Sequence, residues 1–239
     1  METRPIGMQS TYARELKEYI KRYPYRMFNH PFVDGVAEGT LTREQLKGWV
    51  IQEGHYRRAV PRLATLRFVI CTDPEIKPWL AEVMAEETEG MQSGSAGHYQ
   101  LYIKLARALG ASRDELEDSE PLPGPAAHVY WAELILHTEP WFLALTPQLA
   151  SEGQNSPTVR RLYDGFKQHY GLSDDELEFY GVHEEADKDH GNAAEAIVDK
   201  YIVNEQLLEQ AKALVKRKLD LHYQMRDCYR AFSQRVPAQ

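Results

Sequence analysis

Apolar positions recur along almost the whole chain at the three- and four-residue spacing of amphipathic helices. Alternating apolar and polar runs bounded by turn residues, which indicate strands, are hard to find. The pattern predicts helices over about residues 12–22, a short one after 31, 43–71 with a kink at Pro61, 75–89, 98–110, 126–138, 140–170, one beginning after 173, and 192–232. We therefore expect an all-α fold.

Helix starts and stops support this division of the chain. A Ser or Thr followed three residues later by Glu or Gln forms a capping box, which satisfies free N–H groups at a helix start. Such pairs occur at Thr42/Gln45, Ser112/Glu115 and Ser173/Glu176, while the stretches 90–97 and 121–125 are too rich in Gly, Ser or Pro for helix. No repeat or linker divides the chain, so we expect one helical bundle over residues 1–239, with roughly the first ten and last six residues flexible.

Composition narrows the functional classes. The chain has 239 residues and a formal net charge of −8, which disfavours nucleic acid and anionic membrane surfaces as partners. It has no apolar run long enough to span a membrane, and its first residues lack the pattern of a signal peptide. The two cysteines, Cys71 and Cys228, are too few for a disulfide framework. We expect a cytoplasmic protein.

Candidate chemistry is concentrated in one run near residue 185. His183, Asp187 and His190 stand at positions i, i+4 and i+7, which fall at about 0°, 40° and −20° around a helix and so share one narrow face. Two imidazoles and a carboxylate on one face suit iron, manganese or zinc. The alternative is a charged, solvated helix surface, so a metal site requires partners elsewhere in the chain.

Two other segments offer such partners. A carboxylate at the end of one predicted helix (Glu86, Glu87 or Glu89) and His98 at the start of the next could converge across the glycine-rich turn between them. Glu152 extends the apolar stripe of its predicted helix, where a carboxylate is costly unless it is paired or bound to metal. Glu139 is a competing candidate upstream.

Together these segments supply three carboxylates and three histidines, a set sufficient for two metal ions. The candidate ligands are Glu87, His98, Glu152, His183, Asp187 and His190. Oxygen and nitrogen donors without thiolates favour iron or manganese over structural zinc.

The chain resembles the heme-oxygenase-like metal oxidases, close to the pyrroloquinoline-quinone synthase and thiaminase-II-like families. The similarity runs from about His30 to Phe232. It rests on His30-Pro-Phe with Gly39-Thr-Leu-Thr, on Glu86-Glu87 with Gly90 and His98-Tyr, on Glu152-Gly-Gln with Tyr170-Gly, and most specifically on Phe179-Tyr-Gly-Val-His183 with Asp187 and His190-Gly.

This resemblance implies a single-domain seven-helix fold without haem and, in the di-iron branch, two ferrous ions bound by the six residues above. It implies an oxidoreductase that uses dioxygen on an amino-acid-derived or fatty-acid substrate, by oxidative C–C cleavage, decarboxylation or N-oxygenation. A branch that forms 4-aminobenzoate from its own tyrosine uses a lysine near the position where this chain has Arg160 and Arg161, which argues against that branch. Tyr56 near the pocket, and Arg57, Arg58 or Arg161 for a substrate carboxylate, are further candidates.

Other activities on the same fold remain open at this point. Instead of a di-iron oxidase, the chain could be a cofactor-free, quinone-synthase-like oxidase or a thiaminase-like hydrolase with a cysteine nucleophile. It could also be a non-enzymatic interaction protein, because the same fold supports different functions. Neither Cys71 nor Cys228 stands in a setting that would activate a thiol. A bundle of this size is also compatible with a homodimer.

Overall fold

A computed structural model describes residues 10–91, 93–150 and 156–232, with Ser156 and residues 184–193 described by their backbone alone. The flexible termini expected at both ends, and Glu152, fall largely or wholly outside these residues. Within them the chain is helical and contains no strand. The helices are α1 (Thr11–Arg22), η1 (Met27–Asn29), α2 (Pro31–Ala37), α3 (Arg43–Ile70), α4 (Lys77–Glu89), α5 (His98–Ala108), α6 (Arg113–Asp118), α7 (Pro123–Thr138), α8 (Trp141–Leu145), η2 (Thr146–Ala150), α9 (Ser156–Tyr170), α10 (Glu178–Tyr201), α11 (Glu205–Arg226) and η3 (Asp227–Phe232), where η marks a 3₁₀ helix.

The predicted all-α class is confirmed, and so are two of the predicted helix starts. Thr42 accepts a hydrogen bond from the Gln45 backbone while the Gln45 side chain accepts one from the Thr42 backbone, which completes the capping box of α3. Ser112 and Glu115 do the same for α6. The pair Ser173/Glu176 makes the same bonds, but α10 begins only at Glu178.

Three predicted helix boundaries were wrong. The helix expected over 140–170 divides into α8, η2 and α9, and η2 contains Pro147, whose ring and missing N–H disfavour a continuous α-helix. The helix expected over 192–232 is broken where Asn204 caps α11 by accepting from the Leu207 backbone, 2.9 Å away. The predicted 121–125 loop ends early because Pro123 begins α7, a position where proline is tolerated.

These breaks also change the helix count. The described residues form eleven α-helices rather than the seven expected, and three of them, α2, α6 and α8, are short.

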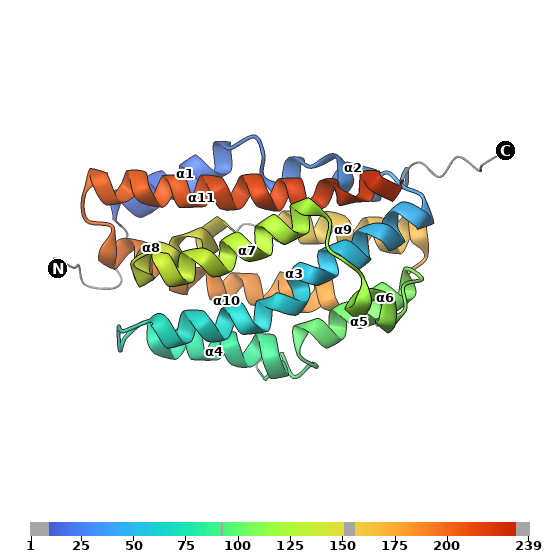
Figure 1. Cartoon of the computed structure of the whole chain (residues 1–239), viewed down its shortest axis with the longest axis horizontal. Helices are drawn as coiled ribbons and strands as arrows, with labels where there is room; N and C mark the ends of the chain where they lie inside the picture. Colours follow the sequence, from blue (N-terminus) through green and yellow to red (C-terminus); the bar gives the residue numbers. More distant parts are fainter. Residues whose placement is uncertain (1–9, 92, 151–155, 233–239) are drawn as a thin grey trace.

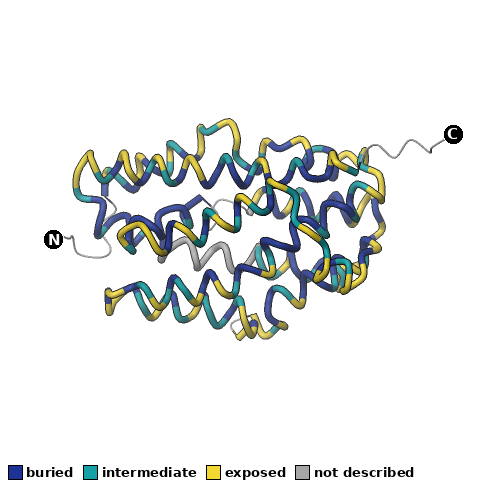
Figure 2. The backbone as a smooth tube through the Cα atoms, in the orientation of Figure 1, coloured by how far each residue is buried: buried dark blue, intermediate teal, exposed yellow. Residues whose placement is uncertain are grey.

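The long helix α3 is central to the bundle and packs against α4, α5, α7, η3 and α11. In Figure 1, α11 and α1 lie along one side, α4 lies on the other, and α10 passes behind α3. In Figure 2, buried and exposed residues alternate along the coloured helices, as amphipathic helices of a bundle require. The interior contains two apolar clusters, one around Leu63 and Val215 and one around Trp49 and Phe166. Both include residues of α3, so this helix connects the two halves of the core.

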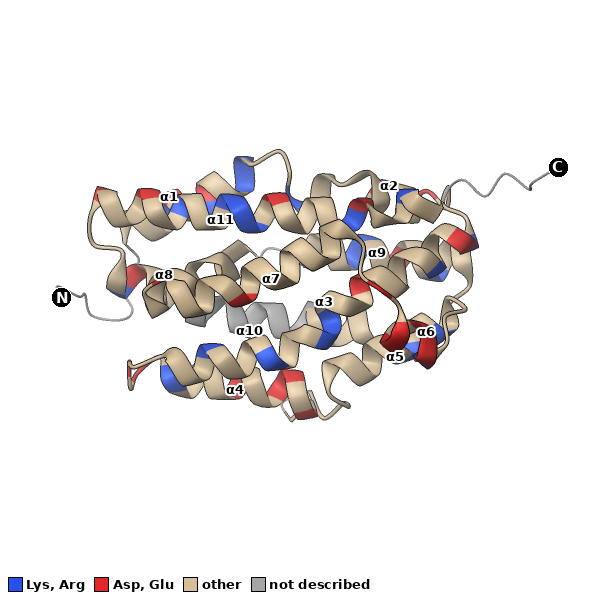
Figure 3. Ribbon diagram, in the orientation of Figure 1, with Lys and Arg blue, Asp and Glu red and all other residues tan. Residues whose placement is uncertain are grey.

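The surface carries mixed charge. Figure 3 shows basic and acidic residues interspersed on most helices rather than gathered by sign. In the part of the chain that the structure describes, every helix is too short or too polar to cross a bilayer.

Candidate metal centre

The turn between α4 and α5 brings a carboxylate and an imidazole together. Gly90 ends α4 with a φ of +64°, in the left-handed region that favours glycine. A Cβ on Gly97 would stand 2.2 Å from the Thr88 carbonyl oxygen, so the returning chain can approach α4 this closely only without a side chain. The start of α5 is thereby held against the end of α4, and His98 lies beside Glu86 and Glu87.

Glu87, His98 and His183 form a triad contributed by α4, α5 and α10. Each offers one ligand atom, and these three atoms all lie within 4.8 Å of one another. The rings of His98 and His183 are 4.5 Å apart between centroids. The structure therefore brings together three of the six residues predicted as ligands.

His98 is held by two carboxylates and buried. Its Nε2 lies 3.2 Å from Glu86 Oε1 in hydrogen-bonding geometry. Its Nδ1 lies 3.0 Å from Glu87 Oε2 but has no partner at hydrogen-bonding angles in the described chain. Burial alone would lower the pKa of His98, yet the two carboxylates outweigh it and raise that pKa. Nδ1 is therefore a buried nitrogen within ion-pair distance of a carboxylate but outside hydrogen-bonding geometry.

His183 is oriented by its own helix. Its Nδ1 lies 2.6 Å from the Phe179 carbonyl oxygen, one turn earlier in α10, so the Nδ1–H donates there and Nε2 retains its lone pair. Burial, followed by the neighbouring His98, lowers the pKa of His183 to about 3. At neutral pH this imidazole is uncharged, which is the form that binds a metal ion.

The other predicted ligands divide into two groups. Glu89 and Glu139 are exposed and lie outside the triad, and Glu86 contacts the Nε2 side of His98 rather than the Nδ1 side. Glu152 and the side chains of Asp187 and His190 lie outside the described residues.

The donors of the triad fit a transition-metal ion such as iron. One carboxylate oxygen and two imidazole nitrogens are suitable ligands for ferrous iron or manganese. Each imidazole uses its second nitrogen on an outer partner, Glu86 or the Phe179 carbonyl, as metal-binding histidines generally do. The unbonded Nδ1 of His98 is the atom that a bound ion would satisfy.

A second polar cluster, which sequence reasoning missed, lies between α3, α7 and α11. In this lysine cluster (Tyr56, His128, Lys218 and His222), Lys218 Nζ is 3.1 Å from Tyr56 Oη and 3.1 Å from His128 Nε2. Lys218 is 2% exposed, and among the described residues no carboxylate lies within ion-pair distance of it. The buried Nε2 of His222 also has no hydrogen-bond partner there.

Burial and charge shift the protonation of this cluster. Burial lowers the pKa of Lys218 and, together with Lys218 itself, lowers the pKa of His128 well below its usual range. Burial would raise the pKa of Tyr56, but Lys218, together with the charges of Arg67 and Arg57, outweighs it and lowers that pKa. The signal for this cluster was present in the sequence, because Lys218 and His222 fall on the apolar stripe of α11 with Leu208, Ala211 and Val215.

The arginines and cysteines predicted as candidates lie in different settings. Arg57 is bonded to the buried Glu53, whereas Arg58 donates to the Glu117 carbonyl and Arg161 to Asp34. Both cysteines are buried, and burial raises the pKa of each thiol. A thiolate nucleophile is disfavoured in such surroundings.

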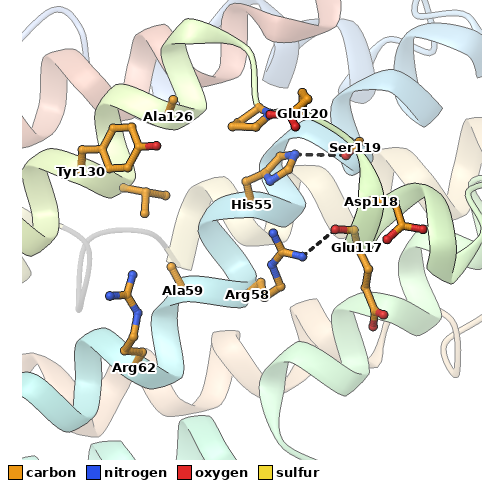
Figure 4. A pocket seen from close by; sticks show the side chains of 12 residues that line it. His55, Arg58, Ala59, Arg62, Glu117, Asp118, Ser119, Glu120, Ala126 and Tyr130 are labelled. Carbon is orange, nitrogen blue, oxygen red and sulfur yellow. Dashed lines mark hydrogen bonds between the residues drawn. The ribbon is translucent and has the colours of Figure 1, made fainter.

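A surface pocket lies on the other side of α3 and contains no residue of the triad. Figure 4 shows His55 directed toward Ser119, and Arg58 toward the backbone of Glu117. Its charged lining residues have both signs, since it includes Arg58 and Arg62 as well as Glu117, Asp118 and Glu120. This mixed lining does not select a ligand class.

Comparison with known proteins agrees with this geometry. The model of a family described as iron-containing redox enzymes matches residues 47–223, which is more than half of the chain. A 4-aminobenzoate synthase of Nitrosomonas europaea is 28% identical over 211 residues, covering 84% of each protein. A pyrroloquinoline-quinone synthase of Klebsiella pneumoniae is 27% identical over 210 residues, covering 83% of this chain and 79% of the relative.

Solved structures agree on the fold. A TenA homologue of Pseudomonas syringae superposes with a TM-score of 0.76 at 14% identity, covering 97% of this chain and 98% of that one. A heme-oxygenase-like domain of Shewanella denitrificans gives a TM-score of 0.70 at 14% identity, with 92% and 89% covered. The predicted heme-oxygenase-like fold class is confirmed.

Proposed function

Because the chain belongs to the family of iron-containing redox enzymes, we propose that it is a non-haem iron oxidase that uses dioxygen to oxidise a small molecule bearing a carboxylate. One observation carries the metal assignment. His98 and His183 each use one ring nitrogen on an outer partner, which leaves the other nitrogen for an ion beside Glu87.

Bound iron would supply the electrons for dioxygen reduction, which side chains alone do not provide. Glu87, His98 and His183 would hold one ion, and Glu152, Asp187 and His190 complete the set proposed for two. Glu86 would keep His98 in position, and the Phe179 carbonyl would fix the tautomer of His183.

The lysine cluster supports an anionic substrate. A buried ammonium without a carboxylate is costly, and an incoming carboxylate would supply its missing partner. Lys218 would then bind this group by a charge-assisted hydrogen bond, and His222, in the tautomer with a proton on its unpartnered Nε2, would donate a second one. Amino-acid-derived molecules and fatty acids both carry such a group, so oxidative C–C cleavage, decarboxylation and N-oxygenation are the proposed reaction types.

The relatives named for 4-aminobenzoate and pyrroloquinoline quinone suggest two more specific activities. The 4-aminobenzoate branch has a lysine near the position of Arg160 and Arg161 in this chain. Here Arg160 is paired with Asp164, and Arg161 with Asp34. This arrangement favours an external substrate over one supplied by the chain itself. The buried thiols give no support to the thiaminase-like alternative.

Oxygen uptake by the reconstituted protein tests this proposal. The metal-free chain is loaded with ferrous iron under argon, and dioxygen consumption is then measured with a panel of amino acids and fatty acids, each beside its primary amide. We expect iron-dependent uptake with an acid and little with its amide. Equal oxygen uptake without iron would contradict the proposed metal dependence. Equal uptake with an acid and its amide would contradict the proposed carboxylate recognition.

A further inference from the structure

Arg57 connects the triad to a buried ion-pair network. Glu53 is 1% exposed and accepts hydrogen bonds from three side chains, with 2.8 Å to Trp49 Nε1, 2.5 Å to Arg57 Nη2 and 3.3 Å to Arg226 Nη2. Arg57 Nε also donates to the same Glu53 oxygen, at 3.1 Å. Two contacts to one carboxylate fix both the position and the plane of the guanidinium.

The guanidinium of Arg57 lies over an aromatic ring that borders the triad. Its Cζ is 5.1 Å from the centroid of the Phe179 ring, within the range of a cation–π contact. The ring of His183 also neighbours the Phe179 ring, 4.4 Å away between centroids, and Tyr102 makes a T-shaped contact with Phe179 at 5.2 Å. Phe179 is 3% exposed, so the ring has little freedom to move.

Phe179 therefore contacts His183 twice. Its carbonyl oxygen accepts the Nδ1–H of His183, and its ring packs against the imidazole. A shift of Phe179 would change both the tilt of the imidazole and the direction of its Nε2 lone pair. Ligand orientation of this kind strongly affects metal affinity.

We propose that Arg57 is a positioning residue for the metal centre, which acts through Phe179 on the ligand His183. The inference rests on the proposed metal-binding role of the triad. Arg57 itself needs no contact with the ion. Its role is to hold the Phe179 ring against His183, using Glu53 as its own anchor.

A matched pair of substitutions separates this role from general stability. Arg57→Met and Arg226→Met each remove one guanidinium from Glu53 and leave it the other, so neither variant leaves the buried carboxylate unpaired. Arg226 lies over Phe32 and Trp49 instead of Phe179. Only Arg57→Met should disturb the triad.

The test uses cobalt(II) chloride with the full-length metal-free protein, since bound cobalt reports both affinity and ligand geometry in its visible spectrum. We expect Arg57→Met to weaken binding about tenfold and to shift the visible bands, while Arg226→Met stays within about twofold of wild type. Phe179→Leu should weaken binding similarly, and adding Arg57→Met to it should cause little further loss, since the two act in series.

Each outcome decides between distinct explanations. If wild type binds no cobalt, the metal assignment of the proposed function fails. If wild type binds it and Arg57→Met is unchanged, or Arg226→Met is affected equally, the positioning role is wrong. Tighter binding by Arg57→Met would also overturn the proposal, because it would mean that Arg57 acts only by repelling a nearby cation.

Discussion

The two polar clusters inside the bundle have opposite charge character. The triad side combines Glu86 and Glu87 with two imidazoles, whereas the lysine cluster combines Lys218 with two imidazoles and a tyrosine. A buried charge is stable only when something compensates it. The first cluster is suited to a cation and the second to an anion, and the contacts of Arg57 with Phe179 and with Tyr56 place it between them.

This difference indicates how one helical interior can bring an ion and an organic acid together. Burial and nearby cationic or imidazole groups lower the pKa values of His128, His183 and His222, whereas Glu86 and Glu87 raise that of His98. The sign of the charged partner distinguishes the two clusters. Changing that partner should change what each cluster binds.

Removing the triad carboxylate should have the largest effect. Glu87→Ala takes away both a ligand oxygen and the negative charge beside two imidazoles, so we expect ferrous iron or cobalt(II) affinity to fall by at least about 100-fold. Equilibrium titration of the metal-free protein measures this. Glu89→Ala is the matched control, because Glu89 is an exposed carboxylate two residues away. Equal losses in the two variants would show that only general negative charge matters.

Removing the buried cation should affect the acid and spare the metal. In Lys218→Met we expect the preference for a carboxylate over its amide, measured by oxygen uptake, to fall by about 10- to 100-fold, the worth of a charge-assisted hydrogen bond. Iron affinity should stay within about twofold. Lys216→Met, on an exposed lysine of α11 paired with Asp220, is the control. If the acid preference survives, the anionic site is not at Lys218.

A subtler change sharpens the role of Glu86. Glu86→Gln keeps a hydrogen-bond acceptor for His98 Nε2 but removes the charge that favours Nε2–H, so we expect cobalt(II) affinity to fall by about tenfold. This loss of affinity is smaller than that expected for Glu87→Ala, because Glu86 orients the ligand His98 whereas Glu87 is itself a ligand. If Glu86→Gln loses as much cobalt(II) affinity as Glu87→Ala, or more, the roles assigned to the two carboxylates would have to be reversed.

The smallest expected effect concerns acid stability and lies outside both clusters. His30 is fully buried, and burial followed by Arg226 lowers its pKa to about 3, while its Nδ1 accepts from the Phe32 backbone at the start of α2. The unfolded chain takes up this proton near pH 6.5 and the folded chain does not, so stability is full above that pH and is lost as pH falls toward 3. This one histidine should cost about 2 kcal/mol between pH 7 and pH 5.

Denaturant unfolding of wild type and His30→Asn at several pH values measures this contribution. Asparagine can still cap α2 but does not titrate, so the variant should lose less stability on acidification even if it is less stable at pH 7. Parallel pH dependences in the two proteins would contradict the buried, neutral state of His30.

Much of the fold was predictable because helix signals are local. The apolar period, the capping boxes at Thr42 and Ser112, and the stop at Gly171 each need only a few neighbouring residues. The errors arose where an apolar stripe continues across a break, as at Pro147 and Asn204. There the backbone geometry changes while the hydrophobic pattern does not.

The site was predictable in part for the same reason. His183 and the pairing of an α4 carboxylate with His98 follow from helix spacing and a glycine-rich turn. The choice of Glu87 over Glu89 beside His98 depends on the tight return at Gly97, which residue types alone do not specify. Lys218 and His222 were missed because their partners Tyr56 and His128 come from other helices.

Iron binding by wild type and His183→Ala is the most direct test of the central claim. The full-length metal-free proteins are titrated anaerobically with ferrous iron and bound iron is counted, with His137→Ala as an exposed-histidine control on α7. We predict saturable binding in wild type and His137→Ala, approaching two irons per chain, and loss of the triad-bound iron in His183→Ala with helical content unchanged. No saturable binding in wild type, or undiminished binding in His183→Ala, would contradict the assignment of this triad as the metal centre.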